Sequence, residues 1–251
     1  MKLLSLNIWG GKVLNPLLHF LTEYSDKVDV FCFQEVFDTS SKRKTSNGAR
    51  ANIFSGIAST LPKFQGYFAP AESGLDFKGP VDFNLSFGLA TFVRDSLKVD
   101  SYGDAVIYEG KNALDHGTMP RNIQRIHLKE KSPVTLFNLH GLWRPDDKGD
   151  NEDRLLQSAK IRKLLDKTNG PVVLCGDFNL LPETESLRIL EDGMKNLVKE
   201  FNISSTRSRL YKKDNKFADY ILVSPEIRVR KFQVLDVVVS DHLPLLLDFE
   251  T

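Results

Sequence analysis

The chain has 251 residues, of which 41% are hydrophobic and 27% charged, and its formal net charge at pH 7 is +1. This length is enough for one large domain with a sizeable core, and the composition excludes a disordered or low-complexity chain. The near-neutral charge excludes binding to a polyanion through net charge alone, so any such binding must come from local basic patches.

Neither the start of the chain nor its cysteines point to an oxidising or membrane environment. An apolar strand begins almost at Met1, without the basic start, long apolar core and cleavage site of a signal peptide. No apolar run has the length of a membrane-spanning helix. Cys32 and Cys175 lie inside apolar runs, which favours buried free thiols in a reducing compartment. We expect a cytoplasmic monomer with no membrane span.

Short runs of strand type recur along the whole chain, with only a few helical patterns between them. The strands are expected at 2–8, 28–34, 67–69, 87–94, 101–108, 123–128, 134–140, 171–175, 219–223, 231–238 and 243–249. The helices are expected at 16–24, with Asn15 as N-cap and Pro16 at the first helical position, at 49–61 and at 152–168.

No linker and no internal repeat divides the sequence. Many strands with few helices, spread over the full length, predict a single α/β domain over residues 1–251, in which two packed sheets carry helices on the outside.

Polar residues interrupt the apolar runs at the ends of several strands. Asn7 follows "LLSL", and Glu35 follows the apolar run "VDVFCFQ". His140 ends "TLFNLH", while Asp177 and Asn179 follow the glycine bend of "PVVLCGDFN". Each residue taken alone is equally typical of a solvated strand end or a turn.

The same feature recurs near the end of the chain. Asp219 opens "DYILV", and Asp241 and His242 separate two apolar runs, where they form either a polar turn or part of an active site. Active sites gather such groups on loops held by a rigid scaffold. Carboxylates without a Cys/His ligand set favour a hard cation, so the pattern favours metal-assisted hydrolysis of a phosphate ester.

Six short motifs, "LSLNIW", "FCFQEV", "NLHG", "CGDFN", "FADYILVS" and "SDHLPL", resemble in sequence and order the endonuclease/exonuclease/phosphatase superfamily. The resemblance runs from Leu4 to Leu247. It implies a DNase I-like four-layer α/β sandwich, with two packed mixed β-sheets flanked by helices and the active site at one sheet edge.

The resemblance also implies a metal site. Glu35 would be the principal Mg²⁺ ligand, Asn7 and Asp241 would complete or support the site, and Mn²⁺ would be a substitute metal. Phosphoryl transfer to water depends mainly on positioning and on neutralising charge, which a metal and hydrogen-bond donors supply.

The remaining motif residues would act on the phosphate and the attacking water. Asp177 would orient or deprotonate the water, and Asn179 would bind the phosphate and steady that water. His140 and His242 would donate hydrogen bonds to non-bridging oxygens, with Asp219 paired to His242. The sequence leaves open whether Asp177 or His242 is the general base.

Basic residues near these motifs are candidates for substrate binding. Arg121 lies just before a strand, where relatives place a phosphate-contacting arginine, although a solvated loop arginine has the same pattern. Arg207 and Arg209 precede Asp219 in the basic stretch "STRSRLYKKDNK", which suits a nucleic-acid backbone or a solubilising loop. A second basic stretch, "KRKTSNGAR", follows the Glu35 motif.

Three classes of function remain open. The first is a nucleic-acid phosphodiesterase, a nuclease or an end-processing repair enzyme. "QEV" and "NLHG" resemble the phosphodiesterase, deadenylase and DNase branches more than the abasic-site branch, which typically has "QET". The second is a phosphatase or phosphodiesterase acting on inositol phosphates or lipid headgroups, and the third is a non-catalytic binding protein.

Phe77 and Phe83 lie in a predicted hairpin. Their side chains would pack on the core, stack on bases or insert into a membrane.

Overall fold

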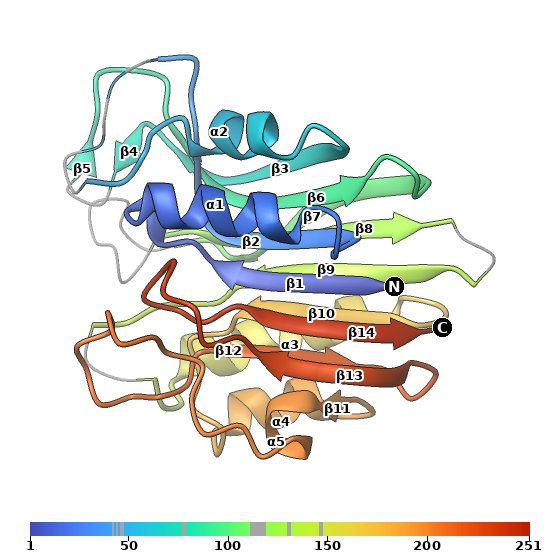
Figure 1. The fold of residues 1–251 in the computed structure, drawn as a ribbon. Helices are drawn as coiled ribbons and strands as arrows, with labels where there is room; N and C mark the ends of the chain where they lie inside the picture. Colours follow the sequence, from blue (N-terminus) through green and yellow to red (C-terminus); the bar gives the residue numbers. More distant parts are fainter. Residues whose placement is uncertain are drawn as a thin grey trace.

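The computed structural model describes residues 1–41, 43, 45, 48–76, 79–110, 119–129, 132–145 and 148–251. Two six-stranded mixed sheets lie face to face (Figure 1). The first has the order β13-β14-β1-β2-β6-β3, and the second has the order β11-β12-β10-β9-β8-β7. The predicted architecture of two packed sheets with outer helices is confirmed.

The strands of the first sheet are β1 (Lys2–Asn7), β2 (Val30–Asp38), β3 (Phe64–Ser73), β6 (Ser86–Arg94), β13 (Arg228–Val234) and β14 (Leu245–Glu250). The strands of the second sheet are β7 (Val99–Tyr108), β8 (Arg121–Leu128), β9 (Val134–His140), β10 (Val172–Asp177), β11 (Lys195–Asn196) and β12 (Asp219–Val223). A short ribbon pairs β4 (Leu75–Asp76) with β5 (Gly79–Pro80).

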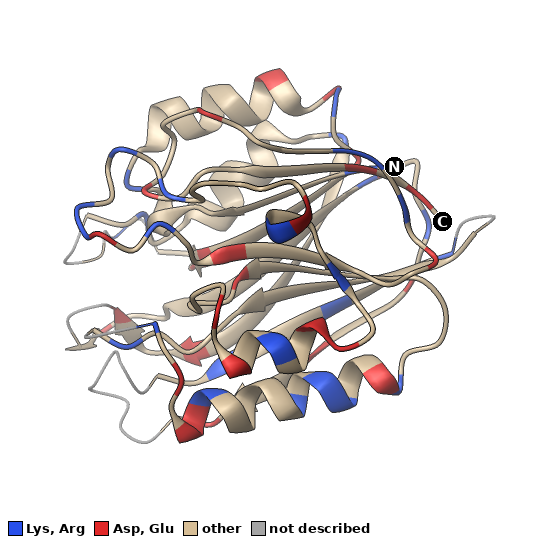
Figure 2. Cartoon of the chain, turned by 90° about the horizontal axis from the view of Figure 1, so that it is seen from below, with Lys and Arg blue, Asp and Glu red and all other residues tan. Residues whose placement is uncertain are grey.

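Helices cover the outer face of each sheet, which gives four layers (Figure 1). The 3-10 turn η1 (Trp9–Gly11) leads into α1 (Leu14–Tyr24), which with α2 (Ile53–Thr60) covers the first sheet. The helices α3 (Glu152–Asp166), α4 (Glu185–Glu191) and α5 (Leu197–Glu200) cover the second. The helices that cover the second sheet carry both acidic and basic residues (Figure 2).

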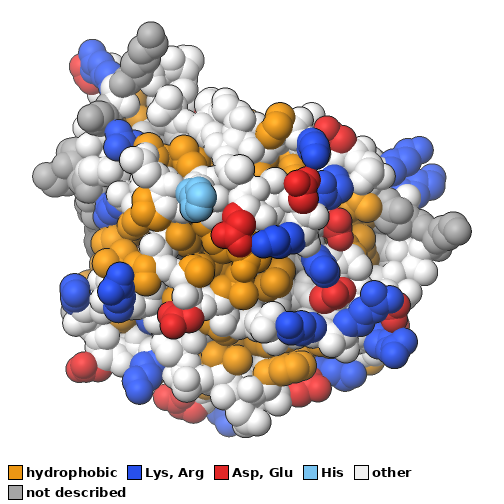
Figure 3. All heavy atoms as spheres, viewed as in Figure 1, with side chains coloured by type: hydrophobic (Ala, Val, Ile, Leu, Met, Phe, Trp, Pro, Cys, Tyr) orange, Lys and Arg blue, Asp and Glu red, His pale blue; other side chains and the backbone are white. Residues whose placement is uncertain are grey.

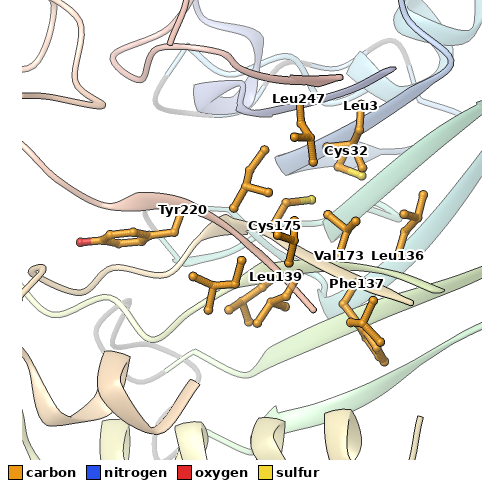
Figure 4. Close-up of a cluster of buried hydrophobic side chains, with 14 of the residues drawn as sticks. Leu3, Cys32, Leu136, Phe137, Leu139, Val173, Cys175, Tyr220 and Leu247 are labelled. Carbon is orange, nitrogen blue, oxygen red and sulfur yellow. The ribbon is translucent and has the colours of Figure 1, made fainter. Parts of the chain in front are cut away.

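Apolar side chains of the two sheets meet in a continuous core. Leu3, Cys32 and Leu247 of the first sheet face Cys175 and Leu139 of the second (Figure 4), and all five are buried. Each buried aliphatic side chain of this kind contributes about 1.5–3 kcal/mol by leaving water. The core therefore fixes the spacing of the sheets on which the polar edge depends.

Parallel pairing brings the polar strand ends to one edge. β1 pairs in parallel with β2, and β9 pairs in parallel with β10, so the carboxyl ends of both pairs lie side by side. In the second sheet Asp177 is in register with His140 on one side and with Asp219 on the other. Asn7 is in register with Gln34 in the first sheet. The polar residues at this edge of each sheet form a row, and the two rows face each other across the sandwich.

The expected helix start at Asn15 and Pro16 is wrong. α1 begins at Leu14, its N-cap is Val13, and Asn15 makes no capping hydrogen bond. Proline is tolerated within the first turn because the backbone N–H groups there have no partner inside the helix. α3 is capped by Asn151, whose side chain accepts a hydrogen bond from the Arg154 backbone N–H.

Several strand boundaries also differ from expectation. β2 continues through Glu35 to Asp38 instead of ending at 34, and β3 is longer than 67–69. β13 begins and ends earlier than the expected 231–238. Its limits are set by its pairing with β14, and the β-branched residues beyond Val234 do not extend it. α2 begins at Ile53 and not at 49, and α4 and α5 were not anticipated because both are short.

The predicted hairpin around Gly79 is present as β4 and β5, but Phe77 lies outside the described residues. Phe83 is partly buried against the core of the first sheet, as expected for core packing. None of the helices formed by the described residues has the length and apolar character needed to span a bilayer.

Candidate active site

Glu35 is placed by an irregularity in strand β2. The pairing of β2 with β6 shifts register between Phe33 and Val36, and Glu35 has φ of 56° there. A bulge of this kind re-aims a side chain that regular alternation would direct elsewhere. The positive φ costs of order 1–3 kcal/mol, and such strain is concentrated at functional sites. The carboxylate is thereby directed into the pocket at the sheet edge.

Asn7 connects the two sheets at this edge. Its side-chain amide donates to Glu35 Oε1 at 3.1 Å and to Asp177 Oδ2 at 3.0 Å. Its Oδ1 accepts from the Trp9 backbone N–H at 2.9 Å, and the Ser240 hydroxyl donates to its carbonyl oxygen at 2.6 Å. Asn7 is fully buried, so these contacts fix the separation of the two carboxylates.

The Ser240–Asp241–His242 turn carries the histidine that the sequence paired with Asp219. His242 Nδ1 lies 2.8 Å from both carboxylate oxygens of Asp219. Its Nε2 lies 3.6 Å from Asp177 Oδ2 and contacts the guanidinium of Arg207. Both members of the His242–Asp219 pair are almost completely buried, so the ring has a fixed orientation toward Asp177.

Asn179 lies directly beyond strand β10. It adopts a φ of 54°, and its backbone N–H donates to Asp177 Oδ1 at 2.9 Å. Its side-chain amide donates to the Gly141 carbonyl oxygen at 3.3 Å, which leaves its buried Oδ1 without a hydrogen-bond partner in the described part of the chain. A buried acceptor of this kind is expected to receive a hydrogen bond from a ligand or a water. A Cβ at Gly141 would overlap the Phe178 carbonyl oxygen, so glycine permits this close approach.

Asp177 and Glu35 differ in the direction of their pKa shifts. Burial alone would raise the pKa of Asp177, but positive charge nearby, chiefly at His242 and Lys148, lowers it far below the ordinary value. Burial raises the pKa of Glu35, and the negative charge of Asp241 raises it further, against a smaller lowering by the Asn7 hydrogen bond. The positive charge of His242 lowers the pKa of Glu35 too little to offset burial and the charge of Asp241.

The two histidines also differ. Burial, followed by the positive charge of Arg121, lowers the pKa of His140 to about 3, so His140 is neutral at neutral pH. Burial and the guanidinium of Arg207 lower the pKa of His242. The carboxylates around His242 outweigh both, so its pKa lies above the ordinary value. His140 Nε2 lies 3.8 Å from Asp177 Oδ2.

The three arginines singled out from the sequence occupy different places. Arg121 is buried at the start of β8 and lines the pocket, and burial lowers its pKa to about 10, so it stays charged at neutral pH. Arg207 also lines the pocket, and its Nη1 lies 3.5 Å from Asp241 Oδ2. Arg209 is exposed and does not line it. On the face seen in Figure 3, basic and acidic side chains are interspersed.

The pocket at the sheet edge has a volume of about 290 Å³. Besides the predicted residues, its walls contain side chains that the sequence did not single out: Trp9, Lys12, Phe87, Met119, Trp143 and Tyr211. Lys12 lies 4.4 Å above the Trp9 ring, and the Arg207 guanidinium lies 4.1 Å from the Tyr211 ring centre. Trp9 ends the motif "LSLNIW" and Trp143 lies two residues beyond "NLHG", and this proximity is the feature by which both could have been found.

The oxygen-rich half of the site fits a hard divalent cation. Glu35 and Asp241 are close enough for one charge to raise the pKa of the other, and a cation between like charges would relieve that repulsion. Asp177, Asp219 and His242 also place one atom each within 4.8 Å of one another. In that second group the histidine Nδ1 already faces Asp219, which is the geometry of a carboxylate-oriented histidine.

Comparisons with known proteins agree with this arrangement. The sequence matches the model of the endonuclease/exonuclease/phosphatase family over residues 4–242. A search of curated proteins finds no match.

Solved structures share the fold. A family protein from Leptotrichia buccalis superposes with a TM-score of 0.72 at 18% identity, covering 100% of both chains. A mannosyl-6-phosphatase of Bacteroides thetaiotaomicron gives 0.70 at 19% identity, also over 100% of both chains. The catalytic domain of human nocturnin with bound sulfate gives 0.68 at 19% identity, over 100% of this chain and 93% of that one.

Members of this family hydrolyse phosphate esters and typically depend on a divalent metal. The family match over nearly the whole chain and the paired polar rows at one sheet edge lead to the same conclusion: the chain belongs to the endonuclease/exonuclease/phosphatase family and is a phosphoester hydrolase.

Proposed function

We propose that this protein is a Mg²⁺-dependent phosphodiesterase that acts on nucleic acid, at a strand end or on a single strand, through a single catalytic domain over residues 1–251. The reaction is the attack of water on a phosphorus atom with departure of an alkoxide oxygen. Mg²⁺, or Mn²⁺ in its place, supplies charge neutralisation at the phosphate when bound.

The two rows of polar residues divide the chemistry between them. Glu35 and Asp241 hold the cation, and Asn7 holds Glu35 in place through its 3.1 Å hydrogen bond. Asp177, deprotonated at all physiological pH values because its pKa is lowered, orients the attacking water and accepts its proton. Asn179 contributes its unpartnered Oδ1 to the same water.

Cationic and neutral donors take the negative charge that develops on the phosphate. His242 would donate from Nε2 once the phosphate displaces the Arg207 guanidinium from that nitrogen, since Asp219 orients the ring through Nδ1 and the pKa of His242 is raised. His140 is neutral and donates through one ring N–H. Arg121 is buried and makes no salt bridge within the described residues, but the negative charges of Glu35 and Asp177 act on it, and it adds a fixed positive charge to the pocket.

The observation that carries the choice of nucleic acid is the pairing of aromatic and basic side chains around the pocket. Trp9 lies beside Lys12, Tyr211 beside Arg207, and Trp143 beside Lys213, whose Nζ is 5.9 Å from the ring centre. Single-stranded nucleic acids are bound in this way, with bases stacked on aromatic faces and phosphates held by nearby cations. Each base–aromatic stack contributes about 1–3 kcal/mol.

A hydrolysis panel tests the proposal. Single-stranded DNA, RNA and an abasic duplex would be compared with inositol phosphates, a sugar 6-phosphate and sphingomyelin, each with Mg²⁺ and with EDTA. We expect Mg²⁺-dependent cleavage of a single-stranded substrate. Activity confined to inositol phosphates, sugar phosphates or lipid would contradict the nucleic-acid assignment.

Substitution of the aromatic walls sharpens the same test. Trp143→Ala should raise KM for an oligonucleotide about tenfold, since a stack worth about 1.4 kcal/mol is lost. Trp143→Phe keeps a planar ring and should retain most of the affinity. Equal KM values for Trp143→Ala and wild type would show that no base stacks there.

A second candidate is a phosphatase acting on a compact phosphorylated molecule, such as an inositol phosphate or a lipid headgroup. The observation in its favour is the volume of the pocket, about 290 Å³, which is at the small end of ligand sites. Such an enzyme would hydrolyse a sugar or inositol phosphate at least as fast as an oligonucleotide, and the panel above separates the two.

A further inference from the structure

A second pocket opens beside the catalytic one. Its volume is about 230 Å³, and Trp143 and Tyr211 line both pockets, so the two share an aromatic wall. The second pocket lies between the loop that follows β9 and the loop that precedes β12. The pocket shares Trp143, Tyr211 and Lys213 with the proposed substrate-binding surface, but none of the residues assigned to the hydrolytic step lines it.

Lys148 is the unusual member of this pocket. Its side chain is 4% exposed, and within the described part of the chain its Nζ makes no hydrogen bond and no ion pair. Placing an ammonium group in such a site without a partner is unfavourable, and buried charges are generally paired. Burial lowers the pKa of Lys148 to about 8, so the group remains mostly charged at neutral pH.

The loop that carries Lys148 is held from both sides. The Lys148 carbonyl oxygen accepts from the Leu181 backbone N–H at 3.1 Å. The Arg154 side chain, fully buried in α3, donates to the carbonyl oxygens of Leu142 and Gly149, at 3.4 Å in the first case. Gln157 Oε1 accepts from the Leu142 N–H at 3.0 Å. The position of the ammonium group is therefore built into the fold before any ligand arrives.

The rest of the second pocket is also mainly basic. Arg144 and Lys213 line it with Lys148, and Asp214 is the acidic residue among the lining residues of the described chain. Arg144 is already paired with Asp153 at 2.6 Å. Lys213 donates to the Pro145 carbonyl oxygen at 2.9 Å and is exposed. Lys148 therefore has no direct hydrogen-bond or ion-pair partner among the described residues, and Lys213 has no carboxylate partner there, so both can receive an anionic ligand.

We propose that the Lys148 pocket binds a second phosphate group of the substrate, joined to the scissile phosphate by a segment that passes Trp143 and Tyr211. The inference rests on the proposed phosphoester chemistry and adds a requirement to it: the preferred substrate carries at least two phosphates. An oligonucleotide end and a doubly phosphorylated small molecule share this chemistry.

Binding to metal-free protein tests the pocket without hydrolysis. Isothermal titration calorimetry in EDTA would compare two matched pairs of ligands that differ by one phosphate. The nucleic-acid pair is a thymidine dinucleotide with and without a 5′-phosphate, and the small-molecule pair is fructose 1,6-bisphosphate and fructose 6-phosphate. The wild type should bind the two-phosphate member about tenfold more tightly in one pair, and that pair identifies the source of the phosphate.

Lys148→Met should abolish this preference, because methionine fills similar space without charge. Lys167→Met, at the exposed C-terminal cap of α3, is the matched control and should keep it. An equal preference in Lys148→Met and wild type, or no preference in the wild type, would overturn the inference. Absence of hydrolysis in the panel above would instead contradict the proposed function and leave this binding result intact.

A second variant keeps the inference testable if Lys148→Met does not fold. Lys213→Met alters an exposed side chain of the same pocket and should reduce the two-phosphate preference about threefold. If Lys148→Met fails to fold, an unchanged preference in Lys213→Met overturns the inference, and a reduced one supports it.

Discussion

Each of the two sheets places a carboxylate at the same edge, and the pKa values of these two carboxylates are shifted in opposite directions. Glu35, from the first sheet, has a raised pKa because it is buried and faces the negative charge of Asp241. Asp177, from the second sheet, has a lowered pKa because histidine and lysine groups surround it. Asn7 donates to both carboxylates and keeps them apart. Similar side chains thus acquire different chemistry from their neighbours.

This difference explains why the active site is built at a junction of two sheets. Two buried carboxylates that repel each other suit a divalent cation, while a carboxylate surrounded by cations stays ionised at neutral pH. Placing the two on separate sheets lets the core between them set their spacing. The following experiments test whether the division holds.

The largest effect is expected for Asp177→Asn. The substitution keeps the shape and removes the proton acceptor, so kcat/KM should fall about 10³-fold. Because the proposed cation site is on the other sheet, added Mg²⁺ should not restore activity. Steady-state kinetics over a range of Mg²⁺ concentrations measures both, with the exposed Asp95→Asn as control. Rescue by Mg²⁺ would move the metal site to Asp177.

Glu35→Gln is expected to show the complementary behaviour. Loss of a ligand charge should weaken Mg²⁺ binding about 100-fold, and high Mg²⁺ should restore part of the activity. Measured half-saturation for Mg²⁺ gives the shift, and Glu200→Gln, an exposed glutamate, should leave it unchanged. An unaltered Mg²⁺ requirement in Glu35→Gln would remove Glu35 from the metal site.

A pH effect on stability is expected from His140. Its folded-state pKa of about 3 lies below the unfolded value near 6.5, so the unfolded chain binds more protons between these values. Stability should therefore fall as pH drops below about 6.5, by about 2 kcal/mol from this group at pH 5. Urea unfolding of metal-free wild type and His140→Asn at pH 7 and 5 isolates the contribution, which should disappear in the variant. Equal pH dependence of the two proteins would show that folding does not lower the pKa of His140.

The smallest effects are expected on substrate binding, where Arg207 and Arg209 should differ. Arg207→Ala removes a cation that contacts His242 in the pocket, and substrate binding should weaken about tenfold. Arg209→Ala alters an exposed side chain, and binding should change less than about twofold. Oligonucleotide titrations of both variants provide the measurement. A larger loss in Arg209→Ala would extend the binding surface beyond the pocket.

Much of the fold was predictable because it rests on local patterns. Alternating and continuous apolar runs indicated most strands, and polar residues at their ends indicated the edge at which they would meet. β12 occupies the expected residues 219–223. The short helices α4 and α5 and the limits of β13 were not predictable, since pairing and packing with distant segments determine them.

The sequence by itself indicated most of the polar residues that line the pocket, because the motifs and their order specify a family whose chemistry follows from carboxylates, histidines and a phosphate. Only the tertiary structure decided how they act. The bulge aims Glu35 into the pocket, whereas the apolar run in the sequence placed Glu35 just beyond the end of a strand. The burial of Lys148 and the different exposure of Arg207 and Arg209 also depend on contacts between loops far apart in the chain. Local sequence patterns indicate where a strand lies and where it ends. Long-range packing sets the environment of each charged group, and that environment determines its pKa and its role.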